Sequence, residues 1–195
     1  SILMQNYRQF IHQEYGVRQL LVEHTHFNDP EKREHIRRLL IRAAQQKTIP
    51  IVNYNDPVSD EENRKMELAI RRSHGDQVVE CVDNDETAAV IANLVHAKKL
   101  VLMTSTEGIY RDSTDPKALV EQVTAKSMEE LEEKVRQLQE SCVGASRAGA
   151  NGAKAKLEYA LKSARQGTMV IIGHARHRLS DLVEGRVACT RIGLE

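Results

Sequence analysis

The sequence lacks the features that mark several large classes of protein. Lys plus Arg and Asp plus Glu each number 28 among 195 residues, so no net charge is available to attract nucleic acid or an anionic membrane. The longest apolar runs, such as TMVIIG, are far shorter than a bilayer-spanning helix, and no secretory signal is visible. We therefore expect a cytoplasmic protein with no nucleic-acid or membrane partner.

Cysteine is scarce as well. The three cysteines, Cys81, Cys142 and Cys189, are widely spaced and form no CxxC pair, so we interpret them as reduced, inert thiols. Repeats, low-complexity tracts and linkers are also missing, which favours a single α/β domain over residues 1–195. We interpret the charge-rich segment 58–75 as a surface excursion of that domain.

The start of the chain lacks an initiator methionine. It begins with Ser1 and passes at once into the helix-like pattern SILMQNYRQF. The apolar positions of this pattern need a surface to pack against. We therefore expect further sequence ahead of Ser1.

What is present is an ordinary globular composition, 41% hydrophobic and 29% charged, in which strand-like and helical segments alternate. Apolar runs of strand length occupy 17–24, 48–56, 77–82, 99–104, 168–173 and 186–190. Helical patterns occupy 1–16, 28–47, 60–76, 85–97, 127–141, 179–185 and the segment after Gly152. Asp29 and Pro30 are typical of an N-cap and a first helical residue. Alternation this dense predicts an α/β fold with a parallel-rich sheet sandwiched between helices.

Ligands of such sheets bind at the carboxyl ends of strands, which directs attention to VNYND, to LMTSTEG and to the loop before a lysine-bearing helix. The NYND cluster, Asn53 to Asp56, ends one strand, and a DNDE cluster opens the helix at 85–97. Together these clusters could hold a zwitterionic ligand, or orient a lysine or a hydrated magnesium ion. Each also has a plainer interpretation, because Asn and Asp are common in turns and Asn84 or Asp85 would serve as an N-cap.

The stretch 146–160, SRAGANGAKAKLEYA, places Gly149 and Gly152 ahead of Lys154 and Lys156. Backbone N–H groups at a helix N-terminus attract phosphate, and glycine lets a ligand approach closely. A flexible surface loop followed by an amphipathic helix with solvated lysines explains the same residues. The loop alone leaves both interpretations open.

The histidines give a weaker signal. His24 and His26 alternate at one strand end, and His174 and His177 are spaced one helical turn apart. Neither pair has an evident third ligand, whereas zinc sites in proteins need three or four. We therefore expect packing or surface roles for them, and no metal site built on histidine.

Taken in order, these motifs resemble those of the amino-acid kinase family, and within it the glutamate 5-kinases. The resemblance runs from Ser1 to about Thr190 and is carried by QLLVEHTHFNDPEKREHIRRLLIRAAQQKTIPIVNYND, VDNDETAAVIANLVHAKKLVLMTSTEGIY and GANGAKAKLEYALKSARQGTMVIIG. The order strand–NxND, DND–helix, LxTxxxGIY and glycine loop–lysine–helix is more specific than any one of these motifs.

The resemblance implies the family's fold and a reaction that moves the γ-phosphoryl group of ATP, with Mg²⁺, to the side-chain carboxylate of glutamate in proline biosynthesis. It implies that Asn53, Asp56 and Asn84 bind the amino acid and that Asp85 orients catalytic groups. Lys156 would stabilise the phosphoryl group during transfer. The implied nucleotide contacts are Thr104, Ser105, Ala150, Asn151, Gly152, Ala153, Lys154 and Lys156. We also expect a homo-oligomer.

The sequence departs from the family pattern in four places. Ser105 stands where the family usually has Asp, and the glycine loop reads GANGA where GTGGM is usual. The segment 58–75 is an insertion absent from the usual pattern. The first strand, with its phosphate-binding lysine, has no counterpart after Ser1, so the resemblance implies a partial domain that lacks its first strands. Two alternatives therefore stay open. One is a non-catalytic homologue that binds nucleotide or amino acid, or only assembles with a partner. The other is a kinase for another acid or for a nucleoside monophosphate such as UMP.

Overall fold

The computed structural model describes residues 2–54, 69–70, 72–73, 78–79, 84–112, 114–141 and 152–195. The chain divides into two compact units, Ser1–Thr87 and Ala88–Glu195, each of which has its own sheet. None of the helices within the described ranges combines the length and the apolar character that crossing a bilayer requires.

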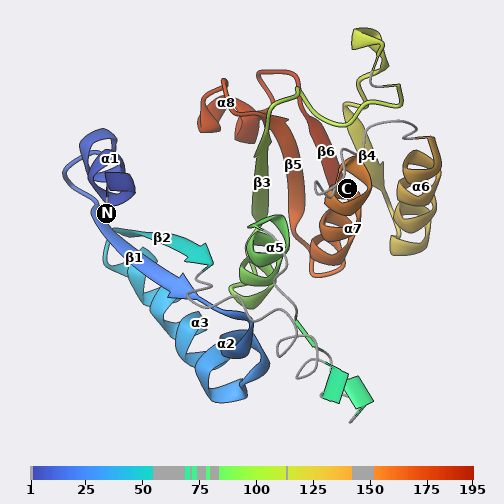
Figure 1. Cartoon of the computed structure of the whole chain (residues 1–195). Helices are drawn as coiled ribbons and strands as arrows, with labels where there is room; N and C mark the ends of the chain where they lie inside the picture. Colours follow the sequence, from blue (N-terminus) through green and yellow to red (C-terminus); the bar gives the residue numbers. More distant parts are fainter. Residues whose placement is uncertain are drawn as a thin grey trace. The chain divides into compact units, whose positions relative to one another are not determined.

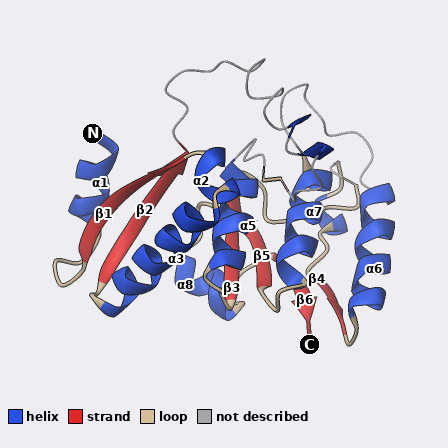
Figure 2. Cartoon of the chain, turned by 90° about the horizontal axis from the view of Figure 1, so that it is seen from below, coloured by secondary structure: helices blue, strands red, loops and turns tan. Residues whose placement is uncertain are grey.

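The first unit is built on a pair of parallel strands, β1 (Gly16–Val22) and β2 (Thr48–Tyr54), in a register that places Val22 opposite Tyr54. Parallel strands need a long crossover. Here the crossover consists of the short helix α2 (His24–Asn28) and the longer α3 (Pro30–Gln45), which runs beside the strands in Figure 2. Helix α1 (Ile2–Phe10) precedes β1.

The start of α3 follows the expectation from the sequence. Asp29 is the N-cap, and its side chain accepts hydrogen bonds from the backbone N–H groups of Glu31 and Lys32 at 2.9 and 3.0 Å. Pro30 is the first helical residue, where its missing N–H costs nothing. The buried side chains Ile36 and Leu40 are four residues apart, so they form the apolar stripe of this helix.

The second unit holds a four-stranded sheet in the order β3-β5-β6-β4 (Figure 1). Its strands are β3 (Lys99–Thr104), β4 (Gln122–Ala125), β5 (Met169–His174) and β6 (Thr190–Leu194). The pairs β3–β5 and β4–β6 are parallel, whereas β5 and β6 are antiparallel. The helices are α5 (Asn84–Leu94), which begins in the last residues of the first unit, α6 (Met128–Ser141), α7 (Ala153–Ala164) and α8 (Leu179–Glu184). A 3₁₀ turn, η1, spans Pro116–Ala118.

Helices lie on both faces of this sheet. Along β5, the side chains of Val170 and Ile172 belong to the larger core, which also contains buried residues of α6 and α7. Ile171 points the other way and packs with Leu182 of α8. Helices α6 and α7 run side by side in Figures 1 and 2. This alternation confirms the expected α/β class with parallel-rich sheets and helices.

Two strand expectations differ from the structure, and one strand was missed. The strand expected at 186–190 begins only at Thr190, because residues 186–189 close the end of α8. There, the backbone N–H of Arg186 donates to Asp181 O at 2.9 Å. Strand β4 was missed because four residues are too few to show a period. Val78 and Val79, the two described residues of the strand expected at 77–82, are not in a strand.

Candidate active site

The carboxyl ends of β3 and β5 lie side by side, because these neighbouring strands are parallel and in register. Thr104 and His174, their last residues, are paired in that register. The ladder continues one step further, since the backbone N–H of Ala175 donates to Thr104 O at 2.9 Å. The segments that leave the two strands therefore start next to each other, at the edge where parallel sheets bind ligands.

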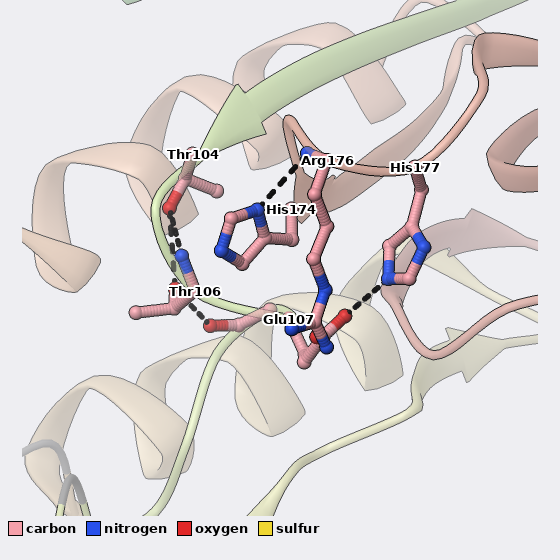
Figure 3. Close-up of polar contacts among 7 residues, drawn as sticks. Thr104, Thr106, Glu107, His174, Arg176 and His177 are labelled. Carbon is pink, nitrogen blue, oxygen red and sulfur yellow. Dashed lines mark hydrogen bonds and ion pairs between the residues drawn. The ribbon is translucent and has the colours of Figure 1, made fainter.

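The segment after β3 forms a compact turn (Figure 3). The backbone N–H of Thr106 donates to Thr104 Oγ1 at 3.0 Å, and the two threonine hydroxyls are 3.1 Å apart. The hydroxyl of Thr106 donates in turn to Gly108 O at 3.0 Å. Ser105 is exposed at the tip. The turn thus presents Ser105 to solvent while Thr104 takes part in the turn itself.

Glu107 connects this turn to the segment after β5. Its carboxylate forms an ion pair with Arg176 and lies 2.6 Å from His177 Nε2 (Figure 3). The side chains of Glu107 and His177 are only 17% and 20% exposed, whereas that of Arg176 is 64% exposed. Burial raises the pKa of Glu107, but the hydrogen bond with His177 and the charges of Arg176, His177 and His174 outweigh it, so the net pKa is lowered.

Contacts between Gly108, Ile109 and Thr190 hold the end of the turn close to the sheet. A Cβ on Gly108 would lie 2.9 Å from the main-chain nitrogen of Thr190, so no larger residue fits without movement. The buried Thr190 hydroxyl accepts the N–H of Ile109 at 2.8 Å and donates to Val120 O at 2.7 Å. These contacts hold the end of the turn against the start of β6.

Helix α7 brings the two lysines to the same end of the sheet. Its last turn leads through residues 165–168 directly into β5, and it packs on β5 and β6, so it runs antiparallel to β5. Its N-terminus, capped by Gly152, therefore lies toward the carboxyl end of β5. Ala153 is its first residue. Lys154 is exposed and Lys156 half-buried, as expected for residues two positions apart on a helix.

In the first unit, Asn53 is exposed near the carboxyl end of β2. Asn84 is exposed and Asp85 half-buried, and both lie in the first turn of α5. A carboxylate there also interacts favourably with the helix dipole. Asp56, Ala150 and Asn151 lie outside the described residues, as do Cys81, Cys142 and most of segment 58–75.

The histidines are placed differently from the expectation. His24 and His26 lie in the short helix α2 and not at a strand end, and Tyr54 Oη is 3.4 Å from His24 Nδ1. His174 ends β5 and His177 follows in a turn, with their ring centroids 6.3 Å apart. The pairing of His177 with Glu107 was missed, because spacing along the chain carries no signal for a contact between residues 70 apart.

A metal site is not evident in the described part of the chain, where no three His, Cys, Asp or Glu side chains are grouped to hold an ion. At the β3–β5 edge, the carboxylate of Glu107 is already paired with Arg176 and His177. The described residues therefore offer a cation few carboxylates. Such a site suits Mg²⁺ when substrate phosphates supply most of its ligands.

Curated relatives match the whole chain. The chain is 30% identical over 200 residues to glutamate 5-kinase of Geobacillus thermodenitrificans, and the match covers 100% of this chain and 47% of that protein. It is 28% identical over 197 residues to glutamate 5-kinase 1 of Bacillus subtilis, covering 99% of this chain and 48% of that protein. The chain therefore spans about half the length of the curated relatives it matches.

A solved structure shows the same fold. Carbamate kinase from Giardia lamblia bound to AMP-PNP matches with a TM-score of 0.54 at 14% identity, covering 82% of this chain and 44% of that one. The amino acid kinase family matches residues 1–174, which is most of the chain. On that match, and with this fold, the chain belongs to the amino acid kinase family.

Proposed function

We propose that the chain is part of an ATP-dependent kinase that transfers the γ-phosphoryl group of ATP to the side-chain carboxylate of glutamate. The bond between the γ-phosphorus and the β,γ-bridging oxygen breaks, a bond from phosphorus to the glutamate carboxylate forms, and ADP leaves. The observation that carries this proposal is the similarity to glutamate 5-kinases along the full chain. Proline biosynthesis, a cytoplasmic location and a homo-oligomeric state belong to the same proposal.

The nucleotide would bind at the β3–β5 edge. We propose Thr104 and Ser105 at the end of β3, together with the loop 150–156, as its contacts, and Lys156 as the cation that stabilises the transferring group. The placement of α7 supports this, because its N-terminus lies toward the carboxyl end of β5. Helix N-terminal N–H groups and a lysine suit phosphate, and phosphoryl transfer depends chiefly on such electrostatic stabilisation.

Glutamate would be bound by Asn53, Asp56 and Asn84, and Asp85 would orient the catalytic groups. The chemistry supports the assignment, because amides can donate to the substrate's carboxylates and a carboxylate can face its ammonium group. Asn53 and Asn84 are both exposed, so each is accessible to a small ligand. Mg²⁺ would arrive with the nucleotide and supply charge neutralisation at its phosphates.

Binding calorimetry tests this proposal. We expect saturable binding of ATP with Mg²⁺, and, in the presence of a non-hydrolysable ATP analogue, binding of glutamate in preference to aspartate or UMP. Asn84→Ala should weaken glutamate binding and leave ATP binding unchanged. Failure of ATP to bind would contradict the kinase assignment. Preference for UMP would contradict the choice of substrate, and ATP binding without any acceptor would favour a non-catalytic homologue.

A further inference from the structure

Glu107 joins the two segments that leave the candidate nucleotide edge. It follows β3, whereas its partners Arg176 and His177 follow β5, so one carboxylate spans both segments (Figure 3). Its contact with His177 is largely shielded from water, which strengthens a charge-assisted hydrogen bond. The contact therefore restrains the edge and is more than a loose surface ion pair.

The turn that carries Thr104 and Ser105 is held at both ends. At its start, Thr104 O accepts the N–H of Ala175 at 2.9 Å. At its far end, Glu107 is anchored to the same β5 segment. Between these anchors the hydroxyls of Thr104 and Thr106 close the turn internally. Loss of the Glu107 anchor would remove the tie between the turn and the β5 segment, and would leave the far end of the turn held only by the contacts of Gly108 and Ile109 with Thr190.

We propose that Glu107 is a positioning residue for the nucleotide, which acts by holding Thr104 and Ser105 in place and not by touching the ligand. The inference rests on the proposed function, which assigns these two residues to the nucleotide. A restrained turn loses less conformational freedom when the ligand binds, so affinity is higher. The same carboxylate keeps Arg176, which is 64% exposed, directed toward the turn.

The test compares the whole chain with Glu107→Gln, which keeps the size of the side chain and removes its charge. The matched control is Glu132→Gln, since Glu132 of α6 pairs with Arg165 at 2.9 Å in the same unit, and both of those side chains are about half-exposed. ATP affinity is measured by calorimetry well below the melting temperature. We expect the Kd of Glu107→Gln for ATP to rise about three- to tenfold. This factor corresponds to the free energy of one charge-assisted hydrogen bond, reduced because the contact is partly exposed to water. Glu132→Gln should not change it.

Hydrogen exchange gives a second readout that does not depend on ATP. Peptides covering 103–108 and 174–178 should exchange faster in Glu107→Gln and at the normal rate in Glu132→Gln. Glu107→Asp should restore part of the protection and part of the affinity. His177→Ala should weaken ATP binding too, and its effect should not add to that of Glu107→Gln, because the two residues act through one contact.

The outcomes separate the inference from the function on which it rests. If the unchanged chain does not bind ATP, the proposed function fails. If it binds ATP and Glu107→Gln leaves the Kd or the local exchange unchanged, the positioning role alone is wrong. Tighter binding by Glu107→Gln would also overturn it, because Glu107 would then be withholding Arg176 from the phosphates.

Discussion

The buried hydroxyl of Thr190 joins three segments of the second unit. It accepts from Ile109 N–H and donates to Val120 O. Thr190→Val keeps the shape but leaves both backbone groups buried without a partner, so we expect the free energy of unfolding to fall by about 2 kcal/mol. Urea denaturation measures this change. The exposed Thr114 provides the control, and equal effects of Thr114→Val and Thr190→Val would refute the role given to Thr190.

The lowered pKa of Glu107 leads to a prediction of how the free energy of unfolding depends on pH. Its pKa in the folded protein is lowered, because the contact with His177 and the nearby positive charges outweigh the effect of burial. A carboxylate with a lowered folded pKa stabilises the fold above its unfolded pKa, and this contribution is lost as the pH falls through the folded value. Unfolding free energies of the unchanged chain and Glu107→Gln should therefore differ near neutral pH and converge in acid. A difference that stays constant with pH would contradict this account.

At the scale of elements, helix α2 is tied to a distant part of the first unit. The side-chain amide of Asn28 donates to Val79 O at 2.8 Å, and its oxygen accepts the Val79 N–H at 2.9 Å. Asn28→Ala removes both bonds, so we expect amide exchange at Val79 to accelerate about tenfold, the equivalent of one hydrogen bond. Asn28→Asp keeps the acceptor and should give an intermediate rate. Unchanged protection in Asn28→Ala would show that other contacts hold Val79.

The elements also show what the sequence could and could not predict. Helix α3 was predictable because Asp29, Pro30 and the apolar stripe are local signals. Strand β4, at four residues, was too short to be recognised, and β6 was placed too early because Arg186 to Cys189 are as apolar as a strand yet form a connection. The pairing of Glu107 with His177 depends on the register of β3 and β5, which no local pattern encodes.

At the scale of the whole molecule, the chain has two compact units, and the proposed residues are divided between them. Among the described residues, those that we propose for the nucleotide lie toward one edge of the second sheet, because β3 and β5 are parallel and α7 runs antiparallel to β5. The motif order was sufficient to predict this family and the α/β class, which the comparisons confirm. Motif order could not predict two separate sheets, because sheet membership depends on long-range pairing.

The most direct test of the central claim is glutamate-dependent release of ADP from ATP, measured in a coupled assay on the longest form of the protein that contains residues 1–195. Lys154 and Lys156 provide a matched pair, because both lie in the first turns of α7 but on different sides of it. We predict that Lys156→Ala lowers turnover about 10²- to 10⁴-fold, the scale of a lost transition-state contact, and that Lys154→Ala has a mild effect. Equal, mild effects of the two substitutions, or ADP release that does not depend on glutamate, would contradict the account.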